Sequence, residues 1–152
     1  MIKLNTTGLD KIELVDPTGT HTTYDINDEL LVTDNNYQVE LLNQPRKYSF
    51  WADKLAIVNR QVSGAKQQLD LVHAKLYAKY YVELSKAKAR PTKDMVEAEI
   101  IQDKEYQSAV TRVDQTTYVA DKLKFIVKAF EERKDMLIQF SAEMRKDREI
   151  GA

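Results

Sequence analysis

The sequence predicts an all-α protein of long coiled-coil-like helices in a helical bundle, with a small N-terminal arm or β-hairpin. Only 4 Gly and 3 Pro occur among the 152 residues, too few turn residues for a barrel or a sandwich. Hydrophobic residues make up 43% of the chain and charged residues 31%, and a globular chain of this length can bury a core. Apolar residues also keep a seven-residue repeat over long stretches, which favours helices paired along a seam.

The first 24 residues differ from the rest of the chain. Ile12 and Leu14 alternate with polar residues, which is the period of a strand. Asp16-Pro17-Thr18-Gly19 is typical of a turn, and residues 21–24 could form the return strand. Because a lone hairpin is marginal in water, this piece either packs on the remaining chain or is a flexible arm. We therefore divide the chain into an N-terminal arm or hairpin, 1–24, and a helical domain, 25–152.

Residues 25–44 have a helical pattern in which Asp34 is the expected N-cap of a helix that carries Tyr37, Leu41 and Leu42. Pro45 predicts a break or kink before the next helix, which we expect at about 46–88. Pro91 then ends that helix. The 46–88 helix has an unbroken apolar heptad pattern at Tyr48, Trp51, Leu55, Val58, Val62, Ala65, Leu69, Val72 and Leu76.

A second long helix is predicted at about 94–147, with Thr92 as its N-cap, because no Gly or Pro occurs between Thr92 and Gly151. One apolar stripe on it comprises Val96, Ile100, Tyr106, Val110, Val113, Thr117 and Ala120. The other, interrupted only by Arg133, comprises Val119, Leu123, Ile126, Phe130, Leu137, Phe140 and Met144. Two stripes need more than one neighbour. An intrachain bundle is one explanation; we favour an oligomer that uses the second stripe, because long heptad-true helices usually associate.

The sequence carries no enzyme signature. There is no Cys and no glycine-rich phosphate loop. His21 and His73 have no partner at metal-ligand spacing, so we expect neither a metal nor another cofactor. Glu97, Glu99 and Glu105 are expected on a solvated helix surface. No apolar run approaches the roughly 18 residues of a membrane span, and the N-terminus lacks a signal-peptide core. We therefore expect no membrane partner and a cytoplasmic location.

Charge is unevenly distributed, although the net charge is only −1. Residues 1–40 carry two Lys and eight acids, residues 41–93 carry eleven basic and three acidic side chains, and residues 94–152 carry ten basic and thirteen acidic ones. This pattern of acidic head, basic middle and mildly acidic tail indicates partners that contact only part of the molecule.

The basic middle is densest between residues 75 and 93, where six cations are opposed only by Glu83. Clustered cations bind phosphates, and interleaved aromatic rings can stack unpaired bases. The candidate residues for binding single-stranded nucleic acid are Lys75, Tyr77, Lys79, Tyr80, Tyr81, Lys86, Lys88, Arg90 and Lys93. The alternative is that the lysines complement a helix end and the tyrosines cover a bundle.

From residue 25 onward the order of segments carries a family resemblance over about 128 of the 152 residues. The segments are DINDELLVTDNNYQVELLNQP, KYSFWADKL, QLDLVHAKLYAKYYVEL, KDMVEAEIIQDKEY and the long C-terminal stretch that begins VTRVDQTTYVADKL. In this order they resemble the UvsY-type recombination mediator proteins of tailed phages. In those relatives a basic turn late in the first long helix is linked to DNA binding, and residues 75–81 match it here.

The resemblance implies an all-α protein that forms a ring-like homo-oligomer through its C-terminal helix. It also implies binding to single-stranded DNA and help for a RecA-like recombinase in displacing single-strand-binding protein, in the host cytoplasm if the protein is phage-encoded. The alternative is a helical oligomeric scaffold or adaptor, such as a virion or assembly protein, without a nucleic-acid role.

Overall fold

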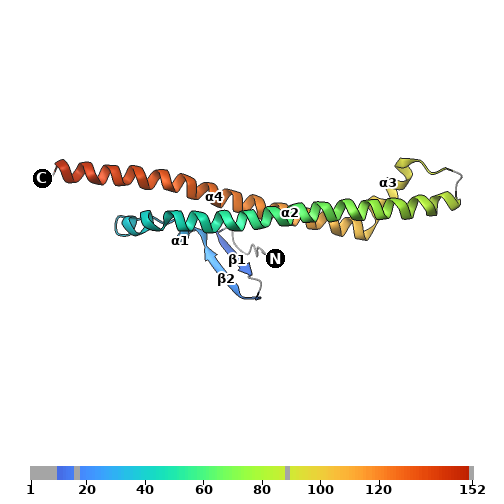
Figure 1. The fold of residues 1–152 in the computed structure, drawn as a ribbon, viewed down its shortest axis with the longest axis horizontal. Coiled ribbons are helices and arrows are strands. Elements are labelled where there is room, and N and C mark those ends of the chain that lie inside the picture. Colours follow the sequence, from blue (N-terminus) through green and yellow to red (C-terminus); the bar gives the residue numbers. More distant parts are fainter. Residues whose placement is uncertain (1–9, 16–17, 88–89, 151–152) are drawn as a thin grey trace. The chain divides into compact units, whose positions relative to one another are not determined.

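The computed structural model describes residues 10–15, 18–87 and 90–150, the last four of these as backbone only (Figure 1). Helix accounts for 82% of it, and the predicted all-α fold with a small hairpin is confirmed. None of the described helices combines the length and apolar character that crossing a membrane requires. The elements are β1 (Lys11–Val15), β2 (His21–Asp25), α1 (Ile26–Leu30), α2 (Tyr37–Ala87), α3 (Lys93–Gln102) and α4 (Lys104–Ile150).

The chain forms two compact units. Unit 1 comprises Met1–Ile57 and Asp121–Ala152, and unit 2 comprises Val58–Ala120. The hairpin and α1 therefore belong to unit 1, and α3 belongs to unit 2. The two long helices, α2 and α4, pack together and contribute to both units.

The N-terminal hairpin forms as the alternation of residues predicted. β1 and β2 pair antiparallel, with Lys11 opposite Asp25 and Val15 opposite His21. Gly19 takes a φ of 86° after the turn, a conformation that glycine adopts without steric cost. Asp16 and Pro17 of the predicted turn lie outside the described residues.

The hairpin packs on α2. Ile12 and Leu14, the alternating pair of β1, are 4% and 8% exposed. Tyr24 of β2 contacts the rings of Phe50 and Trp51 on α2, at centroid separations of 5.5 and 5.4 Å. Burial against a helix supplies the apolar contact that a lone hairpin lacks, so of the two expectations for this segment the packed one holds.

The chain between the hairpin and α2 differs from the prediction. Asp25 caps the short helix α1, with its carboxylate accepting from the backbone N–H of Asn27 at 3.0 Å. The prediction of Asp34 as the next N-cap is wrong. α2 begins at Tyr37, and the residue before it, Asn36, accepts at its carbonyl from the Glu40 N–H at 2.9 Å.

The predicted break at Pro45 is also wrong, because α2 runs without interruption over 51 residues with Pro45 inside it. A proline removes one helical hydrogen bond, and tertiary packing on both sides of it outweighs that loss here. Gln44 and Trp51 flank Pro45, and they are 5% and 0% exposed. Leu42, which the sequence predicts to lie on this helix, is 81% exposed.

The heptad seam of α2 is confirmed in one of its two lines. Trp51, Val58, Ala65 and Val72 recur every seven residues, and all are buried. The other line is only partly covered between residues 48 and 69, and becomes fully buried at Leu76. A strict seven-residue repeat keeps one face of a helix on its neighbour, which explains why the first line stays buried.

The helix predicted over 94–147 is divided in two at Asp103. This residue has extended backbone angles, φ −69° and ψ 131°, and ends α3. Its carboxylate accepts from the Glu105 N–H at 2.7 Å, and its carbonyl accepts from the Gln107 N–H at 3.0 Å. Aspartate is among the best N-cap residues, so Asp103 begins α4. Thr92 caps α3 as predicted, by accepting from the Met95 N–H.

The second stripe of the C-terminal helix is covered largely within the chain. Leu123, Phe130 and Leu137 are at most 1% exposed, and Ile126 is 8% exposed. Val119, Phe140 and Met144 are half-buried. Because the chain by itself covers the deepest members of the stripe, the intrachain bundle accounts for their burial.

Arg133, which interrupts that stripe, is 4% exposed and holds three segments of unit 1 together. Its guanidinium donates to the Leu30 carbonyl at 3.0 Å, to the Gln44 side chain, and to the Glu40 carboxylate. Lys47 also pairs with Glu40, at 3.1 Å. Burial alone would raise the pKa of Glu40, but the hydrogen bonds from Arg133 and Lys47 outweigh it and lower that pKa.

Candidate nucleic-acid interface

The candidate DNA-binding residues lie at one end of unit 2, where the last turns of α2 meet α3 and the start of α4. The core of this end consists of Val72 and Leu76 from α2 with Val96 and Ile100 from α3. Tyr77, Tyr80, Leu84, Tyr106 and Ala109 pack against it. Two of the three candidate tyrosines, Tyr77 and Tyr80, therefore cover the bundle, as the alternative interpretation anticipated.

Acids at the junction of α3 and α4 and at the start of α4 neutralise two of the candidate lysines. Lys75 binds both carboxylate oxygens of Glu105 at 2.9 Å, and Lys79 lies 3.8 Å from the Asp103 carboxylate. Glu97 is likewise paired, with the His73 ring nitrogen at 2.9 Å. Glu99 and Glu105 are exposed, as expected of a solvated helix surface, whereas Glu97 is half-buried. The positive charge of this stretch of sequence is partly cancelled once the chain folds.

Tyr80 links Lys79 to Asp103. The Tyr80 hydroxyl donates to the Asp103 carboxylate at 2.7 Å, and the Lys79 ammonium lies 4.5 Å from the centroid of the Tyr80 ring. The hydrogen bond to Asp103 raises the pKa of Tyr80, and the same bond lowers the pKa of Asp103. Both groups thus keep their usual charge states at neutral pH. Tyr80 is held by its partners rather than free to stack on a base.

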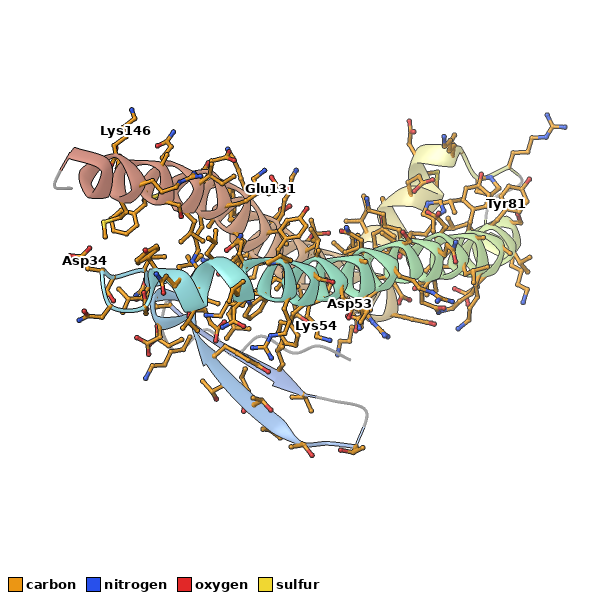
Figure 2. The ribbon with its side chains drawn as sticks, turned by 60° about the vertical axis from the view of Figure 1, so that its left-hand side comes forward. Asp34, Asp53, Lys54, Tyr81, Glu131 and Lys146 are labelled. Carbon is orange, nitrogen blue, oxygen red and sulfur yellow. The ribbon has the colours of Figure 1, made fainter. Side chains whose placement is uncertain are left out.

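Tyr81 is the most accessible of the candidate rings. It is 44% exposed and lies near the C-terminal end of α2 (Figure 2). Its ring stacks on that of Tyr77 at 6.3 Å and 14°, and Tyr77 in turn contacts the His73 ring at 6.3 Å. The stacked pair orients Tyr81 while leaving much of its surface open, which suits a platform for an unpaired base.

Three candidate cations are exposed and have no ion pair among the described residues. Lys86, Arg90 and Lys93 surround the connection from α2 to α3. In lacking an ion pair they differ from Lys75 and Lys79. Lys88 lies outside the described residues. The structure therefore separates the predicted set into cations that balance acids of the same chain and cations open to an external anion.

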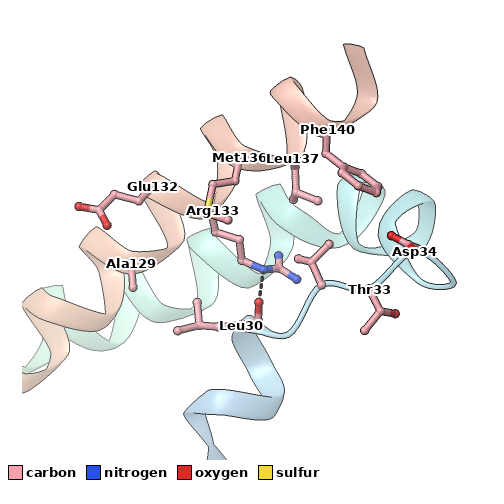
Figure 3. Close-up of a pocket in the computed structure, with 10 residues that line it drawn as sticks. Leu30, Thr33, Asp34, Ala129, Glu132, Arg133, Met136, Leu137 and Phe140 are labelled. Atoms are coloured by element: carbon pink, nitrogen blue, oxygen red, sulfur yellow. Dashed lines mark hydrogen bonds between the residues drawn. The ribbon is translucent and has the colours of Figure 1, made fainter. Parts of the chain in front are cut away.

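Unit 1 contains a second candidate site, a cavity of about 370 Å³ beside Arg133 (Figure 3). Its walls include Leu30 and Val32 on one side and Met136 and Phe140 of α4 on the other. The guanidinium that borders it is already engaged, with the Leu30 carbonyl as the partner drawn in Figure 3. This cavity is apolar, and the cation at its border is already paired with Glu40.

Within the described ranges, no group of three or more His, Asp or Glu side chains is placed to hold a metal ion. Comparisons with protein-family models, with curated proteins and with solved structures found no match to this chain. The functional interpretation therefore depends on the residues themselves.

Proposed function

We propose that this protein is a single-stranded DNA-binding recombination mediator, which helps to load a RecA-like recombinase and to displace single-strand-binding protein. One observation supports DNA binding above the others. Lys86, Arg90 and Lys93 are exposed and have no ion pair within the described residues, and the exposed Tyr81 lies on the same helix end. Cations of this kind bind phosphates by releasing counterions, and a neighbouring ring can stack a base.

The recombinase, the single-strand-binding protein and a ring-like homo-oligomer enter this proposal through the family resemblance. An oligomer would strengthen a weak site of this kind, because several copies on one strand raise the avidity without new contacts. Phe125, Met136 and Ile138 of α4 are between 53% and 70% exposed, so α4 offers apolar side chains of unit 1 to a second copy.

A helical scaffold or adaptor without a nucleic-acid role is the second candidate. Its support is that Lys75 and Lys79 balance acids of the same chain, and that Tyr77 and Tyr80 cover the core. On this interpretation the remaining lysines only keep a helix end solvated.

A salt titration of oligonucleotide binding separates the two candidates. The affinity for a labelled thymidylate oligonucleotide is measured by fluorescence anisotropy, and its logarithm should fall linearly with the logarithm of salt concentration, by about 0.7 per neutralised phosphate. Replacing Lys86, Arg90 and Lys93 together by Ala should reduce the slope by about 2. Replacing Lys75 and Lys79 should reduce it less, because their charges are already balanced.

The matched control replaces Arg112, Lys124 and Lys146 by Ala, three exposed cations of α4 that, like the test set, take part in no ion pair within the described residues. This variant has the same change of net charge, so it should keep the wild-type slope if binding is local to the helix end. Equal slopes for the two triple variants would mean that only overall charge matters. Absence of binding by the wild-type protein at low salt would leave the scaffold as the better function.

A further inference from the structure

A second pocket of unit 1 combines aromatic rings with basic side chains. It has a volume of about 300 Å³ and lies where β2, α1 and the N-terminal part of α2 meet. Its lining consists of Tyr24, Glu29, Arg46, Lys47, Phe50 and Trp51. None of these residues belongs to the predicted DNA-binding set.

Three rings of this pocket contact one another. The centroids of Tyr24, Phe50 and Trp51 are separated pairwise by 5.2 to 5.5 Å, with Trp51 edge-on to both neighbours. Trp51 is fully buried, whereas Tyr24 and Phe50 are half-buried. The two half-buried rings therefore leave aromatic surface open beside the buried indole, and because their planes are tilted by 46°, a planar ligand would stack on one of them and meet the other with its edge.

Trp51 also has an unsatisfied donor. Among the described side chains its indole Nε1 is buried without a hydrogen-bond partner. A buried indole N–H usually finds a partner, and leaving a buried donor unpaired is costly. Because Trp51 is 0% exposed, this donor is closed to solvent, and the accessible surface of the pocket belongs to its other lining residues.

The charges around the pocket favour an anionic ligand. Lys47 lies 3.7 Å from the Glu29 carboxylate and 3.1 Å from that of Glu40, so the only acid of the lining is already balanced. Arg46 is exposed and has no ion pair within the described part of the chain. The Lys54 ammonium lies 4.9 Å from the centroid of the Phe50 ring. A cationic ligand would lack an available acid, whereas a phosphate would meet Arg46, whose planar guanidinium suits it.

We propose that this pocket binds one unpaired base of single-stranded DNA, stacked on Phe50 with its edge against Tyr24, and with Arg46 contacting the adjacent phosphate. This inference rests on the proposed single-stranded DNA binding and adds to it a contact in unit 1. Stacking on an aromatic side chain tolerates any base, because every base has a flat face, so the pocket requires no particular sequence.

Trp51 is the single tryptophan of the chain, so its fluorescence reports on this pocket directly. The experiment titrates the full-length protein with a thymidylate oligonucleotide and records both Trp51 fluorescence and anisotropy of the labelled strand. Binding should quench Trp51 in a saturable way. Phe50→Leu keeps an apolar side chain without the ring and should weaken binding about tenfold. Tyr37→Leu is the control, because Tyr37 lies in unit 1 but outside the pocket, and this variant should keep the wild-type affinity.

Arg46→Gln provides a test that does not disturb the buried rings, because Arg46 is exposed. Arg46→Gln should weaken binding and reduce the slope of log affinity against log salt concentration by about 0.7. Arg60→Gln changes another exposed arginine of α2, and it should reduce both the affinity and the slope by less. Circular dichroism of each variant verifies that the helices remain.

The outcomes separate this inference from the proposed function. Oligonucleotide binding with unchanged Trp51 fluorescence, and equal behaviour of Arg46→Gln and Arg60→Gln, would overturn the pocket and leave DNA binding intact. Quenching that survives unchanged when Lys86, Arg90 and Lys93 are all replaced would keep the pocket and remove the helix end from the site. If the titration gives no Trp51 quenching and no change in anisotropy, both the pocket and the proposed DNA binding are overturned.

Discussion

Removing the charge partner of Arg133 should strongly destabilise unit 1. Arg133 and Glu40 have side-chain exposures of 4% and 14%, so water cannot replace either partner easily. Glu40→Ala leaves the guanidinium buried with two neutral acceptors, the Leu30 carbonyl and Gln44. Breaking a buried ion pair from one side costs about 3–5 kcal/mol. Because those two acceptors remain, we expect about 3 kcal/mol, or about 6–12 °C in Tm for a chain of this size.

Urea unfolding followed by far-UV circular dichroism measures the loss of stability, and Trp51 fluorescence reports on unit 1. Arg133→Met removes the cation and retains the volume. The double variant with Glu40→Ala should cost less than the sum of the two single variants by about 1–3 kcal/mol. Glu132→Ala is the control, because its pair with Lys128 is exposed and should change stability by less than about 1 kcal/mol. A comparably small loss for Glu40→Ala would refute the reasoning.

The ion pair between Glu40 and Arg133 also predicts that the stability of the protein depends on pH. The pKa of Glu40 is lowered from its usual value of 4.5, so the folded state binds this proton less readily than the unfolded chain does. The stabilising contribution of Glu40 is therefore complete above about pH 4.5 and is lost as the pH falls through the lower folded pKa. The stability difference between wild type and Glu40→Gln should shrink over that acidic interval. A difference that stays constant in acid would contradict the assignment.

Three further changes test other parts of the fold. Gly64→Ala should raise stability by about 1 kcal/mol in urea unfolding, because Gly64 lies inside α2 and an added Cβ would meet nothing within 4 Å; a loss would indicate strain there. Asp103→Ala removes the cap of α4 and the acceptor of the Tyr80 hydroxyl, so the Tm should fall by about 2–4 °C. An unchanged Tm would argue against the cap. Leu137→Ala should lower the free energy of unfolding by about 2–5 kcal/mol at any protein concentration, whereas Met136→Ala should lower it little because Met136 is exposed. A loss for Leu137→Ala that varies with protein concentration would indicate that this residue lies in a subunit interface.

The sequence alone was sufficient for the local features of this protein. The hairpin follows from the alternation of Ile12 and Leu14 in β1, and the end of α2 follows from Pro91. The seam of Trp51, Val58, Ala65 and Val72 follows from a repeat that needs no knowledge of its neighbour. These features depend on residues close together in the chain, where backbone geometry and spacing determine the outcome.

Tertiary structure decided the features that depend on distant residues. Pro45 predicts a break in the helix, yet α2 continues through it because packing outweighs one lost hydrogen bond. In the sequence Arg133 only interrupts an apolar stripe, and folding is needed to bring its hydrogen-bond partners Glu40 and Gln44 to it. Asp103 looks like any helix-surface acid until Tyr80, 23 residues earlier, donates to it.

The candidate site shows the same division. Counting charges along the chain found the basic stretch, because Lys75 through Lys93 are neighbours in sequence. It could not find that Glu105, 30 residues beyond Lys75, neutralises that lysine, nor that Tyr24 and Trp51 form one pocket. Composition and periodicity describe what each segment carries, whereas pairing of charges and rings depends on which segments folding brings within a few ångströms of each other.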